Sequence, residues 1–194
     1  MSEGEREGAG PVVAVFGGSF DPPHVGHVLV ACWARVAAAV DEVLVVPTYA
    51  HAFGKRSAPY ADRRAMLELA LEGLRGVRIS DVERDLGGES SRTLHTLQAL
   101  AKRTPGARFR LVIGADILAE THRWHRWEDV AALAPPLVVG RGGYPQPDEC
   151  PFTMPEISST EVRRRLQAGE RAEGLVPPAV LAYARDRGLY REAP

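Results

Sequence analysis

Two histidines near the N-terminus, His24 and His27, provide the clearest chemical signal in the sequence. They lie with Gly26 at the expected start of a helix, whose first N–H groups have no internal partner and carry partial positive charge. A glycine-bearing turn that leads into such a helix binds anions, most often phosphate. Imidazoles beside it can donate hydrogen bonds to phosphoryl oxygens. A simpler alternative is that His24 caps the helix and that His27 lies on the surface.

The elements that position these histidines are a strand, a turn and a helix. Residues Val12–Phe16 form a short β-branched and aromatic run that favours a buried parallel strand, and Gly17 and Gly18 are expected to end it. The prolines of Asp21–Pro23 exclude a helix interior there. Apolar residues then recur at helical spacing, which predicts an amphipathic helix with one apolar face: Val25, Val28, Leu29, Cys32, Val36 and Val40.

A second hydroxyl-rich helix start lies far along the chain, at Ile157–Leu166. Ser158 and Ser159 precede helical spacing, and Arg163 follows one turn later. Backbone N–H groups, hydroxyls and a guanidinium that can hold two oxygens again favour phosphate. Ser158 and Glu161 also fit a plain capping box. Two such helix starts in one small domain favour the functional interpretation.

The rest of the chain alternates between strand and helix patterns without an internal repeat. This alternation predicts a doubly wound α/β fold with a parallel sheet and a helical C-terminal piece. We expect residues 1–10 to form a flexible tail and residues 11–194 a single domain. The further expected strands are Val43–Val46, Val77–Val82, Phe109–Ile113, Leu137–Val139 and Phe152–Met154, and the further expected helices are Asp62–Leu74, Thr93–Arg103 and Pro178–Arg187.

Composition excludes several classes of protein. Of 194 residues, 45% are hydrophobic and 25% charged, which is typical of a globular chain rather than a disordered one. The net charge of −1 gives no electrostatic reason to expect nucleic acid or a membrane surface as a partner. No apolar run is long enough for a membrane span, and the polar start is not a secretory signal. Cys32 and Cys150 are far apart, which favours reduced thiols in a cytoplasmic protein.

The segment Gly-Gly-Ser-Phe-Asp-Pro-Pro-His-x-Gly-His resembles the His-x-Gly-His nucleotidyltransferase superfamily, and this variant of it looks like the nicotinate mononucleotide adenylyltransferase branch. The resemblance extends from Val12 to Tyr190. It implies a Rossmann-like nucleotidyltransferase fold and transfer of an adenylyl group from ATP to nicotinate mononucleotide, giving deamido-NAD and pyrophosphate in NAD biosynthesis. It also implies Mg²⁺ bound mainly through the ATP phosphates, because the sequence shows no dedicated carboxylate cage.

The same resemblance implies roles at the ATP site. His27 would stabilise the α-phosphoryl group in the transition state, and His24 would hold phosphates from the side. Arg163 would hold the departing phosphates, and Asp116 would bind the ribose. The family's Ile-Ser-Ser-Thr-x-x-Arg motif is matched in full. The remaining ATP-binding residues that the resemblance implies are Gly17, Gly18, Ser19, Phe20, Gly26, Gly114, Ser158, Ser159 and Thr160.

The resemblance places the mononucleotide among residues from three segments. Lys55 matches a loop lysine that contacts the phosphate, although Ala52–Gly54 depart from the family's usual Pro-Pro-His. Trp124 matches a tryptophan stacked on the pyridine ring, with the amide of His125 near the ring's carboxylate. The third segment supplies Ser91, Arg92 and Thr93, where Arg92 replaces the usual aromatic residue. Ser91 and Thr93 could alternatively serve only as helix-capping residues.

Three alternatives to nicotinate mononucleotide adenylyltransferase stay open at this point. A related adenylyltransferase would use phosphopantetheine or nicotinamide mononucleotide as the acceptor. A non-catalytic nucleotide sensor could share the fold, although it would not need His24, His27 and Arg163 together. The sequence does not determine the oligomeric state and leaves a homo-oligomer open.

Overall fold

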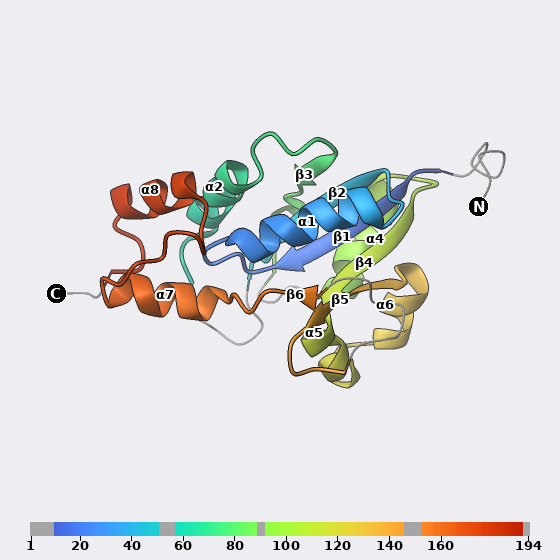
Figure 1. Ribbon diagram of the computed structural model, residues 1–194. Helices are drawn as coiled ribbons and strands as arrows, with labels where there is room; N and C mark the ends of the chain where they lie inside the picture. Colours follow the sequence, from blue (N-terminus) through green and yellow to red (C-terminus); the bar gives the residue numbers. More distant parts are fainter. Residues whose placement is uncertain (1–9, 51–56, 89–91, 146–152, 192–194) are drawn as a thin grey trace.

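A computed structural model describes residues 10–50, 57–88, 92–145 and 153–191 of the chain (Figure 1). Its centre is a six-stranded, all-parallel sheet with the strand order β3-β2-β1-β4-β5-β6. The expected doubly wound fold with a parallel sheet is therefore confirmed. The strands are β1 (Val12–Gly18), β2 (Glu42–Pro47), β3 (Val77–Ile79), β4 (Arg108–Gly114), β5 (Pro136–Arg141) and β6 (Thr153–Met154).

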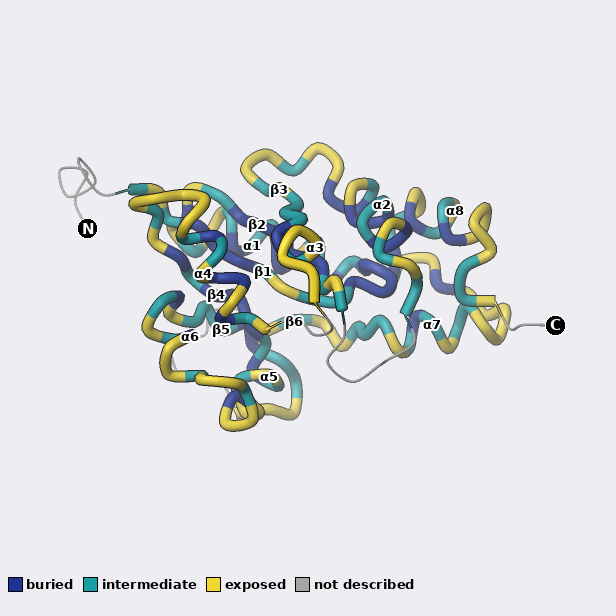
Figure 2. The backbone as a smooth tube through the Cα atoms, turned by 180° about the vertical axis from the view of Figure 1, so that it is seen from behind, coloured by how far each residue is buried: buried dark blue, intermediate teal, exposed yellow. Residues whose placement is uncertain are grey.

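Helices cover both faces of the sheet. On one face, α3, α4 and α6 pack against alternate residues of β1, β2 and β4, and on the other face α1 and α2 pack against the intervening ones. Figure 2 shows the resulting band of buried backbone through the middle of the molecule. The bounds are α1 (Val25–Ala37), α2 (Tyr60–Ala70), α3 (Val82–Leu86), α4 (Thr93–Arg103), α5 (Ala115–Glu120), α6 (Trp127–Leu133), α7 (Ser159–Gln167) and α8 (Pro178–Asp186), with a 3₁₀ turn at Thr121–Arg123.

The C-terminal helices form a separate cluster at one end of the sheet (Figure 1). Val162 of α7 and Val180 of α8 are fully buried together with Met66 of α2. The expected C-terminal helical piece is thus joined to the rest of the molecule through α2. Within the described part of the chain, no helix is long and apolar enough to cross a membrane.

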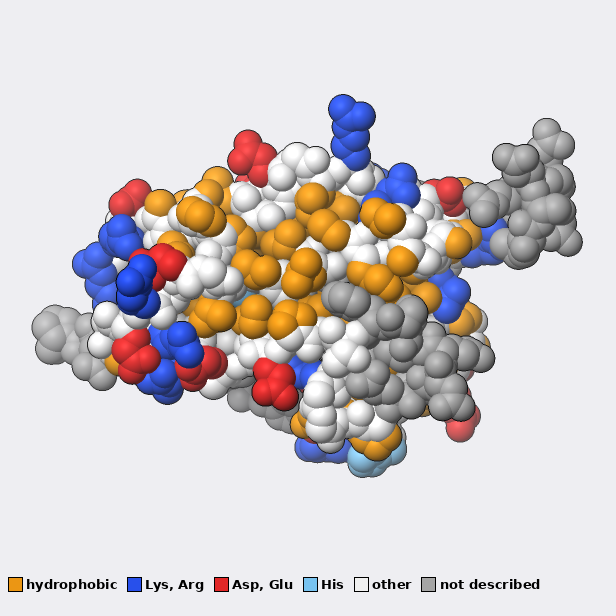
Figure 3. All heavy atoms as spheres, viewed as in Figure 1, with side chains coloured by type: hydrophobic (Ala, Val, Ile, Leu, Met, Phe, Trp, Pro, Cys, Tyr) orange, Lys and Arg blue, Asp and Glu red, His pale blue; other side chains and the backbone are white. Residues whose placement is uncertain are grey.

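The buried face of α1 differs from the expected one. Gly26, Val30, Ala31 and Ala34 are buried, whereas Leu29 and Val36, expected in the core, are 38% and 84% exposed. Small residues on the buried face let α1 approach the sheet closely. Apolar residues occur at helical spacing on both faces of α1, so the spacing alone does not show which face is buried. As a result, apolar side chains gather over the face of the molecule along which α1 runs (Figure 3).

Three other expectations were wrong in detail. The first strand does not stop at Phe16, because Gly17 and Gly18 both pair with β2 and the strand ends at Gly18. Val82 does not belong to a strand but begins α3. Val77 and Ile79 do lie in β3, as expected. The boundary was wrong because the alternating pattern was extended to one more apolar residue, Val82. Asp62 lies inside α2 and not at its start.

Candidate active site

A cavity of about 410 Å³ opens at the carboxyl ends of β1 and β4. These two strands are neighbours in the sheet, and the strand order reverses between them. In open α/β sheets, ligands bind at such a reversal, outside the carboxyl ends of the strands. The cavity is lined by strand ends, the start of α1, and residues of α4, α5, β5 and β6. It therefore brings together residues from both the early and the late motifs of the sequence.

The two histidines lie together in this cavity. Their rings are stacked, with 3.6 Å between the ring centroids. His24 precedes the first turn of α1, and its backbone N–H donates to Nδ1 of His27 over 3.0 Å. Because Nδ1 accepts this bond, the ring proton of neutral His27 lies on Nε2. His27 thus offers an N–H donor to a ligand in the cavity.

Both rings are held in the neutral form. Burial, and to a smaller extent the positive charge of Arg141, lower the pKa of His24 from 6.5 to about 4. Burial, then His24, then Arg141 lower the pKa of His27 well below its usual value. His24 is only 5% exposed, and its Nδ1 has no hydrogen-bond partner among the described residues.

The turn before α1 is held in an unusual backbone conformation. Phe20 has a φ of 48°, in the left-handed region that bulky residues rarely adopt. Its buried ring packs edge-on against Phe16 and His27, with centroid separations of 5.4 and 4.9 Å. A Cβ added at Gly26 would lie 3.0 Å from the His24 ring and from the Met154 methyl group. Ring packing and this glycine therefore fix the position of the histidine pair.

The start of α7 contacts the same turn from the other side. Ser158 caps the helix by accepting from the Glu161 N–H, while the hydroxyl of Ser159 donates to the Pro22 carbonyl over 3.0 Å. Arg163 Nη1 donates to the Asp21 carbonyl over 2.6 Å. Its Nη2 donates to Thr160 Oγ1 over 3.3 Å. Of these residues only Ser158 lines the cavity, so phosphate contacts of Ser159, Thr160 and Arg163 stay a prediction.

Asp116 faces the cavity from the first turn of α5, directly after β4. A Cβ at Gly114 would collide with the Asp116 carboxylate, so the glycine makes room for it. Asp116 Oδ2 lies 3.5 Å from Nε of Arg141, which stands at the end of β5 and also lines the cavity. The site therefore contains a carboxylate suited to hydroxyl groups beside a cation suited to phosphate.

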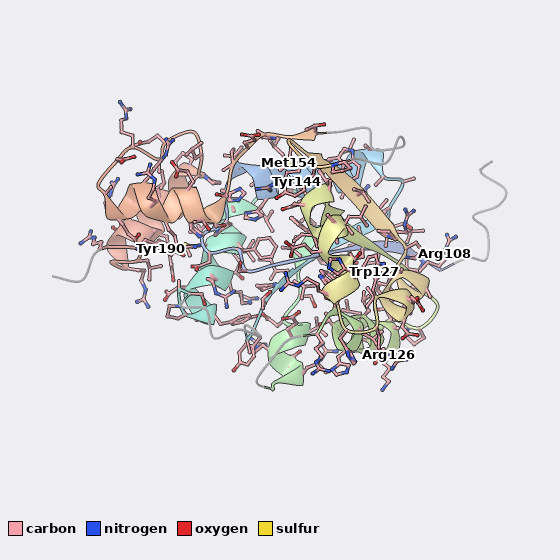
Figure 4. The ribbon with its side chains drawn as sticks, turned by 90° about the horizontal axis from the view of Figure 1, so that it is seen from below. Arg108, Arg126, Trp127, Tyr144, Met154 and Tyr190 are labelled. Atoms are coloured by element: carbon pink, nitrogen blue, oxygen red, sulfur yellow. The ribbon has the colours of Figure 1, made fainter. Side chains whose placement is uncertain are left out.

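The residues expected around a pyridine ring are only partly together. Thr93 and Trp124 line the cavity, and the Trp124 ring packs edge-on against Trp127 at 5.7 Å. Trp127, labelled in Figure 4, is the first residue of α6 and packs against the core. The side chains of Arg92 and His125 are exposed, and neither residue lines this cavity. Arg92 instead borders an adjoining groove beside α4, which shares Glu83 and Thr96 with the cavity.

Two of the expected site residues, Lys55 and Ser91, lie outside the described residues. Within the described ranges, no group of three or more His, Cys, Asp or Glu side chains is arranged to hold a metal ion.

Comparison with known proteins identifies the family. A family model described as cytidylyltransferase-like matches residues 15–165. A protein from Anaeromyxobacter sp. (strain K) named probable nicotinate-nucleotide adenylyltransferase is 48% identical over 184 residues, which cover 94% of this chain and 98% of that protein. A relative of the same name from Myxococcus xanthus is 40% identical, with coverage of 92% and 94%.

The chain belongs to the nicotinate-nucleotide adenylyltransferase family. The family resemblance seen in the sequence is thereby confirmed. Among solved structures, Plasmodium falciparum nicotinic acid mononucleotide adenylyltransferase complexed with NaAD has a TM-score of 0.80 at 18% identity, covering 93% of this chain and 98% of that one. At this identity the likeness establishes the fold, which is that of a Rossmann-like nucleotidyltransferase.

Sequence reasoning assigned no site role to three residues that lie in or behind the cavity, Arg141, Glu83 and Arg63. Arg141 follows the expected fifth strand, and ligands bind outside the carboxyl ends of parallel strands, so its position is a signal that could have found it. Glu83 lines the cavity and accepts from the Tyr49 N–H and the Thr96 hydroxyl over 3.0 and 3.2 Å. It was missed because the strand before it was extended too far.

The third of these residues, Arg63, is fully buried and does not line the cavity. It donates to the carbonyls of Ser19 and Thr48, each over 2.7 Å, and to that of Ala58 over 3.0 Å. Ser19 therefore contributes a carbonyl to the scaffold of the turn. No short-range pattern in the sequence predicts which carbonyls an arginine of α2 will reach.

Proposed function

We propose that this protein transfers the adenylyl group of ATP to nicotinate mononucleotide, forming deamido-NAD and releasing pyrophosphate. The observation that carries the proposal is the stacked, neutral pair of His24 and His27 at the start of α1, inside the cavity where the strand order reverses. Membership of the family supports the same reaction. The activity belongs to NAD biosynthesis.

The reaction requires no covalent intermediate with the protein. A phosphate oxygen of the mononucleotide attacks the α-phosphorus of ATP and forms a new P–O bond. The bond from that phosphorus to the oxygen bridging to the β-phosphate breaks, and pyrophosphate leaves with its electron pair. Catalysis then consists of positioning the two substrates and stabilising the charge that develops on the α-phosphoryl oxygens.

The chain's own residues divide this work. His27 donates from Nε2 to an α-phosphoryl oxygen, and the free N–H groups of the first turn of α1 add to it. His24 and Arg141 hold the outer phosphates, and Asp116 accepts from the ribose hydroxyls. We assign Arg163, Ser159 and Thr160 to the departing pyrophosphate and Lys55 to the incoming phosphate.

Mg²⁺ fits this site as a companion of the substrate. Asp116 is a carboxylate that lines the cavity, and Arg141 already pairs with it. The ion would therefore bind mainly through the ATP phosphates, where it neutralises their charge. A cytoplasmic location and a homo-oligomer also stay predictions.

A pyrophosphate-release assay with ATP and a panel of acceptors tests the proposal. We expect release with nicotinate mononucleotide and much less with nicotinamide mononucleotide or phosphopantetheine. Equal efficiency with the two pyridine mononucleotides would refute the preference for the acid. ATP binding without pyrophosphate release from any acceptor would instead identify a nucleotide sensor.

A further inference from the structure

The carboxylate of Asp21 connects the histidine turn to distant parts of the chain. Asp21 is 2% exposed, and its Oδ1 accepts from the hydroxyl of Tyr190 over 2.6 Å and from the Ala58 N–H over 3.1 Å. Its Oδ2 lies 3.7 Å from Nη1 of Arg163. Three segments, the one before α2, the first turns of α7 and the segment after α8, therefore meet at one side chain.

The backbone conformation and the packing of Tyr190 hold its side chain against the Asp21 carboxylate. Its φ of 60° lies in the left-handed region, which a tyrosine adopts only where its surroundings hold it there. The side chain packs in the cluster formed by α2, α7 and α8, and Figure 4 labels it at this end of the molecule. Burial, followed by the bond to Asp21, raises the pKa of its hydroxyl. Tyr190 therefore stays a hydrogen-bond donor at any physiological pH.

The position of Asp21 determines where the histidines lie. Only Pro22 and Pro23 separate it from His24, and proline restricts φ, so this connection has little freedom. Asp21 is also held at its carbonyl by Arg163, and Pro22 is held by Ser159. Tyr190 itself does not line the cavity. The hydrogen bond to Asp21 is therefore the direct link from the Tyr190 hydroxyl to the histidine turn.

We propose that Tyr190 is a positioning residue for adenylyl transfer, which holds Asp21 and thereby sets the placement of His24 and His27 against the α-phosphoryl group. The inference rests on the proposed function. It predicts that loss of the Tyr190 hydroxyl lowers the rate of the chemical step more than it weakens substrate binding, because misplacement of catalytic groups is felt most in the transition state.

The same cluster supplies a matched control. Tyr183 of α8 donates its hydroxyl to Oδ1 of the buried carboxylate of Asp62 over 2.9 Å, at a place that does not touch the cavity. Tyr183→Phe and Tyr190→Phe each remove one tyrosine–aspartate bond from the same helical cluster. A purely structural role would affect thermal stability in both variants and turnover in neither.

The experiment measures kcat, the KM values for ATP and nicotinate mononucleotide, and the melting temperature of both variants and the wild type. For Tyr190→Phe we expect kcat to fall about 5- to 100-fold, with both KM values changed less than about 3-fold. Tyr183→Phe should keep the wild-type kcat. An unchanged kcat in Tyr190→Phe, or equal losses in both variants, would overturn the inference.

A double-mutant cycle with Asp21→Asn tests the route of the effect. If Tyr190 acts through Asp21, adding Tyr190→Phe to Asp21→Asn should lower kcat by less than about 2-fold more. Fully additive losses would overturn the route through Asp21. A wild-type protein that releases no pyrophosphate would refute the proposed function, whereas normal wild-type turnover with an unaffected Tyr190→Phe would refute only this inference.

Discussion

The two ends of the cavity are built in different ways. We call the region of Asp21, His24, His27 and the start of α7 the phosphate end, and the region of Thr93, Trp124 and Glu83 the pyridine end. At the phosphate end, hydrogen bonds from α7 and from Tyr190 hold the turn before α1. At the pyridine end, side chains enter the cavity from α3, α4 and the segment before α6, and two expected members, Arg92 and His125, do not line it.

The two kinds of recognition require different precision in the placement of side chains. Charge stabilisation in a transition state needs donors fixed before the reaction begins, so the phosphate end is rigidly connected. A planar ring needs a surface of the right shape, and neighbouring helices can supply it with fewer bonds. Substitutions at the phosphate end should therefore change kcat, and substitutions at the pyridine end should change KM.

The largest expected effect comes from His27→Ala. Removing one preorganised donor to the α-phosphoryl group should lower kcat by about 10²–10³-fold while ATP binding stays within about 3-fold of wild type. Single-turnover measurements and ATP titration separate the two quantities. His122→Ala, which alters an exposed histidine outside the cavity, is the control. Near-normal turnover in His27→Ala would remove the distinction between the two ends.

The neutral state of His24 predicts a dependence of stability on pH. Its pKa is about 4 in the folded protein and 6.5 when exposed, so below pH 6.5 the unfolded chain binds a proton that the folded protein resists. Stability is thus complete above pH 6.5 and decreases as the pH falls toward 4. Between about pH 7.5 and about pH 5 this histidine should lower the free energy of unfolding by about 2 kcal/mol.

Urea unfolding of wild type and His24→Gln at the two pH values measures this contribution. The variant should lose that part of the pH dependence, while His27, whose pKa is also lowered, retains its own part. Identical pH dependence in the two proteins would show that His24 is not held neutral.

Arg163→Lys tests the connection between α7 and the phosphate end. Lysine keeps the charge but cannot donate to the Asp21 carbonyl and to Thr160 as the guanidinium does. We expect affinity for ATP and for pyrophosphate to fall about 10-fold, with unchanged affinity for the mononucleotide. Calorimetric titration of each ligand checks this, and an unaltered ATP affinity would mean that Arg163 does not hold phosphate.

Trp124→Ala tests the pyridine end of the cavity. Loss of an aromatic surface for the pyridine ring should raise the KM for the mononucleotide about 5- to 10-fold, consistent with the usual strength of ring stacking. The KM for ATP should stay within about 2-fold. A fall in kcat larger than the rise in KM would contradict the division of labour proposed for the two ends.

The smallest effect is expected for Arg92→Tyr. The Arg92 side chain is exposed and borders the adjoining groove rather than the cavity. The ratio of kcat/KM for the acid and amide mononucleotides should therefore change less than about 2-fold. A large change in this ratio would show that the residue turns inward when substrate binds.

The sequence predicted the parts of the molecule that depend on local chemistry. The order of strands and helices followed from apolar runs and turn residues, and the bounds of α4 agree with the expected Thr93–Arg103. The starts of α1 and α7 were recognisable because hydroxyl, glycine, histidine and arginine residues gather there, although Ser158 also serves as a helix cap. Gly114 and Asp116 were selected through the family resemblance, and their place at the end of a predicted strand agrees with it.

Long-range contacts could not be predicted in this way. The buried face of α1 was ambiguous because both of its faces are apolar. Nothing near Arg63 in the sequence indicates which three carbonyls it holds, and nothing near Asp21 points to Tyr190. Whether Arg92 enters the cavity depends on the direction of one side chain, which spacing along a helix does not determine.

The separation of 169 residues between Asp21 and Tyr190 has a consequence for how the site is made. Synthesis runs from the N-terminus at about 5–20 residues per second, so Tyr190 follows Asp21 out of the ribosome by roughly 10–30 seconds. During that interval the nascent chain can carry both histidines and every strand of the sheet while the Asp21 carboxylate lacks the Tyr190 hydroxyl. The nucleotide site is therefore begun by the first strand to be synthesised and completed by one of the last residues.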